Sequence, residues 1–146
     1  MSSECKNIIE RNVFIFWTGT NPMNSIRIGN IDFMKQVIQA NVILITPENL
    51  GDYIVEGHPI HPAYEYLSYV HRTDYLRTYF MHHHGGGYCD IKPPLGSWEK
   101  AFQDMIDNPD KYINGYKEPY PSCAARLDLQ EHYKLLVGNG ALAHIS

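Results

Sequence analysis

The stretch VFIFWTGTNP at residues 13–22 decides the fold class of this chain. Its first five residues are all apolar and β-prone, and the five that follow are typical of a turn. A short, wholly apolar run that ends in turn residues is typical of a strand buried on both faces in a parallel sheet. We therefore expect a buried strand at residues 13–17, followed by a turn.

The next elements alternate between helix and strand. Apolar residues recur at helical spacing after Ser25, a candidate N-cap, which predicts a helix to about Gln39. The run VILI at residues 42–45 predicts a second buried strand. Residues 63–84 contain neither Gly nor Pro, and we expect them to form the longest helix of the chain, about six turns long.

Weaker patterns follow in the second half of the chain. The glycines at residues 85–87 stop the long helix, and residues 88–91 predict a short strand. Ser97 can cap a helix that runs to about Asp107, and residues 112–116 predict a further strand. Strands that alternate with helices in this way predict an α/β layered domain.

The whole chain, residues 1–146, is short enough to form a single domain. Residues 117–134 have no clear pattern, and the apolar stretch at residues 141–145 stands at the very end. We expect either a compact core or the front part of a larger domain.

Composition excludes several classes of protein. Hydrophobic residues make up 44% of the chain and charged residues 19%, which argues against disorder. The net charge of −4 argues against a basic nucleic-acid-binding surface. No apolar run approaches the roughly 20 residues of a membrane span, so we expect neither nucleic acid nor a membrane span among the partners.

Cysteine usage and the N-terminus bear on the cellular compartment. The three cysteines, Cys5, Cys89 and Cys123, are odd in number and widely spaced, which argues against a disulfide framework and against a CxxC zinc site. Residues 1–12 lack an apolar signal core. Both features predict a reducing, cytoplasmic location.

Three charged residues gather around the predicted long helix and the strand after it. Asp74 and Arg77 are three residues apart, so they lie on neighbouring positions of a helix, and Arg77 falls among apolar residues, where its charge needs a partner such as Asp74. Asp90 follows the glycines at the end of a strand, where ligands bind in open α/β sheets. Taken singly, Asp74 and Arg77 are also consistent with a structural ion pair, and Asp90 with a turn carboxylate that accepts local N–H groups.

This segment resembles the sugar-binding region of DXD-type glycosyltransferases with a GT-A fold, a group that includes capsular polysaccharide transferases. The family reads Ser-Asp-x-x-Arg, a helical stretch, Gly-Gly-x-Tyr, one residue, and Asp-x-Asp. Here TDYLR stands at residues 73–77 and GGYCDIK at residues 86–92. The family's Ile-Trp-x-Gly corresponds to FWTG at residues 16–19, while GYKE at residues 115–118 and GNGA at residues 138–141 are weaker matches.

The resemblance implies a GT-A-like, Rossmann-like nucleotide-sugar-binding sheet flanked by helices, as a truncated or minimal version. It is closest to small transferases of bacteria and large algal viruses, which implies a cytoplasmic location, in the host for a viral chain, and a role in polysaccharide biosynthesis. The implied partners are a nucleoside-diphosphate sugar donor and a glycan or glycoprotein acceptor.

Donor binding would fall on particular residues. The resemblance implies that Trp17 stacks on the nucleotide base, although a core tryptophan is the alternative, and that Thr18 and Gly19 let backbone groups approach the base or ribose. It implies that Asp74 accepts hydrogen bonds from sugar hydroxyls, while Arg77 fixes Asp74 and reaches the diphosphate.

The strand after the glycines supplies the remaining donor-binding residues. The resemblance implies that Asp90 binds ribose or sugar hydroxyls and a divalent metal, Mn²⁺ or Mg²⁺. It also places Gly87 and Tyr88 in the donor-binding segment, with Tyr88 packed behind the loop.

Lys92 departs from the family pattern, because a charged lysine cannot ligate the metal as the family's second acidic residue does. One interpretation is that Lys92 neutralises the diphosphate and makes the metal weak or dispensable. A second is that Asp90, phosphates, waters and an acidic group elsewhere hold the metal. A third is that the chain binds donor but is catalytically impaired.

The sequence therefore predicts an enzyme, a glycosyltransferase that moves a hexose or deoxyhexose from a nucleotide sugar to a glycan hydroxyl. The alternatives are a non-catalytic nucleotide-sugar or carbohydrate-binding module, and an unrelated α/β nucleotide-binding protein. The catalytic residue is unknown; Glu118 and Asp128, in the unpatterned region, are candidate bases. The histidines at residues 82–84 diverge by about 100° per residue on a helix, so we expect no zinc site there.

Overall fold

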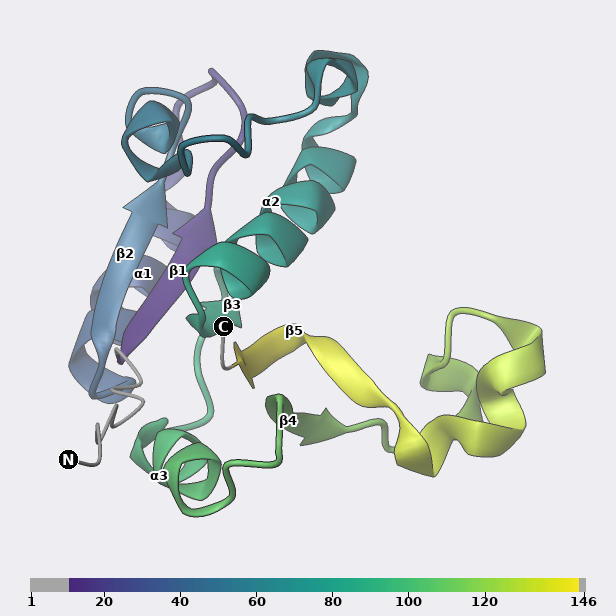
Figure 1. Ribbon diagram of the computed structural model, residues 1–146. Helices are drawn as coiled ribbons and strands as arrows, with labels where there is room; N and C mark the ends of the chain where they lie inside the picture. Colours follow the sequence, from purple (N-terminus) through teal and green to yellow (C-terminus); the bar gives the residue numbers. More distant parts are fainter. Residues whose placement is uncertain (1–10, 145–146) are drawn as a thin grey trace, which may run out of the picture.

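The computed structural model describes residues 11–144, and its sheet is built around the predicted first strand (Figure 1). Strand β1 (Asn12–Phe16) pairs in parallel with β2 (Asn41–Ile45) on one side and with β3 (Gly86–Cys89) on the other. Its side chains alternate between the two faces, and all four of residues 13–16 are buried. The prediction of a strand buried on both faces is confirmed.

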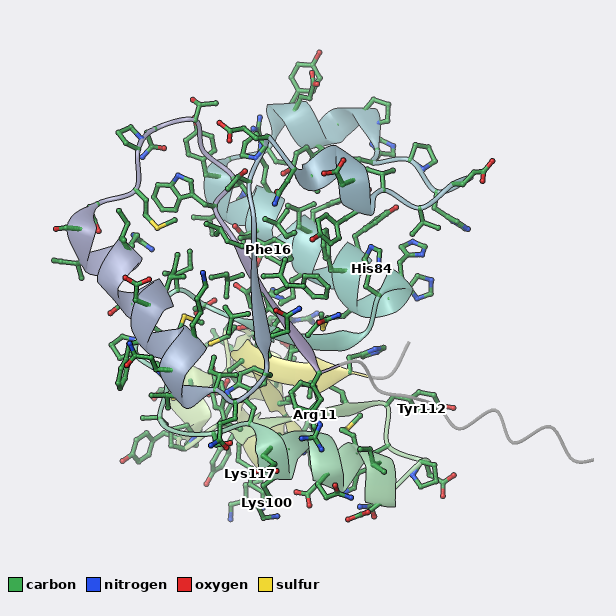
Figure 2. All side chains as sticks on the ribbon, turned by 90° about the vertical axis from the view of Figure 1, so that its left-hand side faces the viewer. Arg11, Phe16, His84, Lys100, Tyr112 and Lys117 are labelled. Carbon is green, nitrogen blue, oxygen red and sulfur yellow. The ribbon has the colours of Figure 1, made fainter. Side chains whose placement is uncertain are left out.

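Helices cover both faces of this sheet, and Figure 2 shows α1 and α2 on opposite sides of it. Helices α1 (Ser25–Val37) and α3 (Glu99–Asp107) pack with Val13 and Ile15, whereas α2 (Tyr69–His83) packs with Phe14 and Phe16. The core on the α2 side of the sheet is rich in aromatic rings, which pack around Phe80 of α2. The three-layer arrangement confirms the predicted α/β class.

The sheet is mixed, with the strand order β2-β1-β3-β5-β4. Strands β4 (Ile113–Lys117) and β5 (Val137–His144) pair antiparallel to each other, and β5 pairs antiparallel to β3. The sequence did not indicate β5, because its glycines and alanines carry little β-propensity. Gly138 makes this strand fit, since a Cβ there would overlap the ring of Tyr116.

The long helix was predicted wrongly in its first part. Residues Pro62–Tyr66 form a 3₁₀ turn (η2), and the α-helix begins only at Tyr69. Ser68 ends the preceding segment because it has an extended backbone and its Oγ accepts a hydrogen bond from the His71 N–H at 3.3 Å. A serine N-cap therefore divides the segment that we expected to form one long helix.

Several other boundaries differ from the prediction. Asn24, not Ser25, caps α1, because the Asn24 side chain accepts from the Arg27 N–H at 2.9 Å. Strand β2 is an edge strand that is mostly half-buried, whereas we expected a buried strand. Strand β3 begins two residues early, at Gly86, after Gly85 and Gly86 turn the chain with positive φ of 64° and 78°.

The unpatterned region folds into short 3₁₀ segments. After η1 (Leu50–Tyr53) in the first half, two more, η3 (Pro121–Cys123) and η4 (Leu127–Leu135), connect β4 to β5. Figure 1 shows this connection reaching away from the helical layers.

Some predictions fall outside the described residues. They concern Cys5, residues 1–10 of the segment inspected for a signal peptide, and Ile145 at the end of the last apolar stretch. Within residues 11–144, no helix combines the length and the hydropathy that a membrane span requires.

Candidate functional site

A cavity of about 480 Å³ opens at the carboxyl ends of β1 and β3. It is lined by residues 16–19 at the end of β1 and in the turn after it, by residues 88–92 around the end of β3, by Arg27 of α1, and by the first turns of α2. The chain leaves β1 through α1 on one face and reaches β3 through α2 on the other face. The cavity therefore lies at the topological switch point of the parallel strands, where open α/β sheets bind ligands.

Trp17 forms one wall of this cavity and is held in place from two sides. Its indole Nε1 donates to the carbonyl of Asn21 at 2.9 Å, and the Arg27 guanidinium lies 5.4 Å from its ring centre. Trp17 is half-buried, so an aromatic surface beside a cation faces the cavity. Sequence reasoning missed Arg27; its place in the first turn of the helix after β1 is the signal that could have found it.

The turn after β1 is fastened to α2. The buried Thr18 hydroxyl donates to the Tyr69 carbonyl at 2.9 Å, and Thr73 donates to the same oxygen at 3.1 Å. Gly19 lines the cavity as well, where a Cβ would overlap the Asn21 side chain. The structure thus brings three predicted donor-binding residues, Trp17, Thr18 and Gly19, to one cavity.

Asp74 and Arg77 form the predicted ion pair, with 2.8 Å between Asp74 Oδ1 and Arg77 Nη2. The Arg77 side chain is only 16% exposed, and its guanidinium lies 5.3 Å from the centre of the Tyr88 ring. A weaker hydrogen bond joins Arg77 Nη1 to the Asn139 carbonyl of β5 at 3.4 Å. Neither Asp74 nor Arg77 lines the cavity. They contact its wall from behind, through Tyr88.

Tyr88, Asp90 and Lys92 form a continuous polar chain along the cavity. The Tyr88 hydroxyl donates to Asp90 Oδ1 at 2.6 Å, and Lys92 Nζ lies 3.1 Å from Asp90 Oδ2. Burial and the neighbouring Asp90 carboxylate raise the pKa of Tyr88, so it stays a phenol and a donor. The hydrogen bond to Asp90 raises the pKa of Lys92, so it stays an ammonium at neutral pH.

Gly87 has a packing role within the sheet, and Cys89 lines the cavity with an unreactive thiol. Gly87 lies within β3 and outside the cavity lining, and a Cβ there would overlap the Trp98 ring. Burial raises the pKa of the Cys89 thiol to about 11, which keeps it protonated and unreactive at neutral pH.

A second cavity of about 510 Å³ adjoins the first and shares Cys89 and Lys92 with it. Its other walls are the loop at residues 93–98, with Trp98 at its end, and strands β4 and β5, including Tyr116. The lining is mainly apolar and aromatic, and Lys92 is its only charged member among the residues that the structure describes. The two cavities therefore meet at one ammonium group.

The candidate bases lie elsewhere. Asp128 lies in η4, where both of its carboxylate oxygens accept hydrogen bonds from Arg126, at 2.7 and 3.0 Å. Neither Glu118 nor Asp128 lines either cavity. Within the described part of the chain, Asp90 is the single carboxylate that lines the first cavity.

The histidines at residues 82–84 take different neighbours. His84 Nε2 lies 2.8 Å from the Tyr53 carbonyl, while the His83 ring centre lies 4.8 Å from that of His58. Across residues 11–144, no group of three or more His, Cys, Asp and Glu side chains is arranged to hold a metal ion.

No family model, no curated protein and no solved structure matches this chain.

Proposed function

We propose that this chain is a glycosyltransferase that moves a hexose or deoxyhexose from a nucleoside-diphosphate sugar to a glycan hydroxyl. The observation that carries the proposal is the cavity at the switch point of the sheet. Its lining includes an indole, two cations and a carboxylate, from Trp17, Arg27, Lys92 and Asp90. Its volume of about 480 Å³ falls in the range of small-molecule sites.

Each part of a nucleotide sugar has a suitable partner in this cavity. The indole of Trp17 offers a planar face for the base, and Thr18 and Gly19 allow the backbone to come close to the ribose. Two cations, Arg27 and Lys92, suit the negative diphosphate, because ammonium and guanidinium groups bind phosphate oxygens strongly.

Asp74 and Arg77 have a positioning role in this proposal. Arg77 contacts the ring of Tyr88, and Tyr88 donates to Asp90, so the pair holds the carboxylate that faces the cavity. Asp90 accepts hydrogen bonds through both of its oxygens from protein donors and stays available, half-exposed, to sugar or ribose hydroxyls.

In the reaction, the bond between the anomeric carbon and the phosphate oxygen breaks, and the nucleoside diphosphate leaves with the electron pair. The acceptor oxygen forms the new bond to the anomeric carbon, and its proton passes to the released diphosphate or to solvent. The negative charge on the leaving group needs a fixed positive partner, and Lys92 lies where the two cavities meet.

The acceptor, by the same proposal, occupies the second cavity. Trp98 and Tyr116 give this cavity aromatic surfaces, which suit the apolar faces of sugar rings. Because Lys92 borders both cavities, an acceptor placed there would bring its hydroxyl close to the donor's diphosphate.

One observation favours a second candidate, a non-catalytic nucleotide-sugar-binding module. In the part of the chain that the structure describes, the only carboxylate of the first cavity is already paired with Lys92 and Tyr88. A free general base for the acceptor is therefore not supplied by the lining of that cavity.

Two measurements on the same protein separate these functions. Calorimetry with a panel of nucleotide sugars tests binding, and an assay of released nucleoside diphosphate with glycan acceptors tests turnover. The transferase predicts both, with turnover lost in Asp90→Ala and kept in Asp104→Ala, a matched control on α3 that lines neither cavity. Binding without turnover for any donor supports the module, and no preference for nucleotide sugars over plain nucleotides contradicts both.

A further inference from the structure

The resemblance implies a divalent metal at Asp90, and the donor set there does not fit one. Protein sites for Mg²⁺ usually offer one or two free carboxylates beside the phosphates of the substrate. Asp90 has one oxygen engaged by the Tyr88 hydroxyl at 2.6 Å and the other by Lys92 Nζ at 3.1 Å. An ammonium next to Oδ2 takes the space of a metal ion and repels it.

Lys92 is held in this position by the backbone as well as by its charge. The Lys92 N–H donates to the Asp90 carbonyl at 2.9 Å, which closes a tight turn at the end of β3. The Asp90 N–H donates to the Gly140 carbonyl of β5 at 2.8 Å, which fixes the turn to the sheet. These backbone bonds fix where the Lys92 side chain starts, and the Asp90 carboxylate holds its ammonium.

Gly140 leaves space next to the Asp90–Lys92 ion pair because it has no side chain. A Cβ at this position would lie 3.0 Å from Asp90 Oδ2, 3.1 Å from Lys92 Nζ and 3.2 Å from the Tyr116 hydroxyl oxygen. The same Tyr116 oxygen accepts the Gly140 N–H at 3.4 Å. A carboxylate, an ammonium and a phenol thus converge on one position that has no side chain.

The Lys92 ammonium is still accessible to a ligand. Its side chain is 55% exposed, and it lines the same cavity as Arg27, which approaches from α1. Among residues 11–144, the charged side chains in the lining are two cations, Arg27 and Lys92, and one anion, Asp90, which is already paired. The positive charge of the cavity therefore favours an anionic ligand without a metal ion.

We propose that the Lys92 ammonium replaces the divalent cation of this site and neutralises the diphosphate of the donor, so that nucleoside diphosphates bind without metal. This inference rests on the proposed function and specifies how that function treats its leaving group. It assigns Lys92 the role of the resident positive charge, with Asp90 and Gly140 as its support.

Calorimetry in excess EDTA and in excess Mn²⁺ tests the inference, with UDP, GDP and inorganic pyrophosphate as probes. We expect binding of at least one of these in EDTA, with no more than a small gain from Mn²⁺. Lys92→Met keeps the aliphatic stem and removes the charge. It should weaken that binding in EDTA by roughly 10- to 100-fold, the usual value of a hydrogen bond to a charged group. Lys100→Met, which removes an exposed ion pair on α3, is the matched control and should bind like the wild type.

The outcomes separate the inference from the function it rests on. If wild type binds UDP or GDP only with Mn²⁺, or if Lys92→Met binds as well as wild type in EDTA, the inference is overturned and the proposed function stands. Lys92→Asp creates a pair of carboxylates and should bind only with Mn²⁺; tight binding by this variant in EDTA also overturns the inference. No binding of any probe under either condition overturns the proposed function itself.

Discussion

Replacing Gly140 with alanine should impair ligand binding while leaving the fold intact. The new Cβ would lie 3.0 to 3.2 Å from Asp90 Oδ2, Lys92 Nζ and the Tyr116 hydroxyl, closer than ordinary van der Waals contacts. Gly140 does not have a positive φ, so the alanine backbone itself is unstrained. The three neighbours must therefore move by a few tenths of an ångström.

The expected magnitudes follow from what can move. Overpacking usually costs about 1–3 kcal/mol, and the low end applies because Asp90 and Lys92 end in half-exposed groups. Replacing a glycine within a strand returns roughly 0.5–1 kcal/mol of conformational entropy. The free energy of unfolding should thus change by no more than about 1 kcal/mol. If Lys92 binds phosphate as proposed, displacing Nζ weakens one charged hydrogen bond, and the Kd for pyrophosphate or UDP should rise about tenfold.

Urea unfolding and calorimetry on the same preparation measure the two quantities. A folded Gly140→Ala protein with an unchanged Kd for UDP would refute the idea that this position supports the Lys92 ammonium. A loss of several kcal/mol in unfolding free energy would show instead that the neighbours cannot move, which contradicts the packing argument.

Three further predictions concern stability. Ser68→Ala removes the cap of α2 and should lower the unfolding free energy in urea by about 1 kcal/mol; no change would mean that the Ser68 Oγ contact is not a cap. Gly29→Ala, in an exposed part of α1 with no atom within 4 Å of the new Cβ, should raise it by roughly 0.5–1 kcal/mol, and a decrease would contradict the open space seen there. The pKa of His83 is lowered below 6.5, first by partial burial and then by three neighbouring histidines, His82, His58 and His84. The unfolded chain therefore binds the His83 proton more tightly than the folded chain does. Stability should therefore fall as the pH falls from about 6.5 through the folded pKa, and His83→Gln should flatten the curve of thermal midpoint against pH; identical curves would contradict this.

Part of the fold was accessible from the sequence because its signals are local. The apolar run at residues 13–17 and the turn after it specify a buried strand without reference to any other segment. The Asp74–Arg77 pair follows from helix spacing and from the cost of an unpaired charge, and the structure has it at 2.8 Å. In such cases the residues that decide the structure are neighbours in the sequence.

Other features were not accessible, either because they depend on contacts between distant segments or because one local signal outweighed another. Strand β5 has a weak pattern of its own and is a strand because β3 and β4 pair with it on both sides. The start of α2 was missed because an uninterrupted absence of Gly and Pro outweighed the capping signal of Ser68. Arg27 entered the site only when α1 was placed against the end of β1.

The site itself combines both kinds of information. The segment GGYCDIK at residues 86–92 supplies the tyrosine, carboxylate and ammonium, and their order is visible in the sequence. Their arrangement depends on β5, since Gly140 accepts the Asp90 N–H and leaves room under the ion pair, while the Asn139 carbonyl contacts Arg77. A strand that local patterns do not indicate therefore fixes the charges that the motif provides. For this reason, a side chain at Gly140 should weaken ligand binding although Gly140 lies outside the motif.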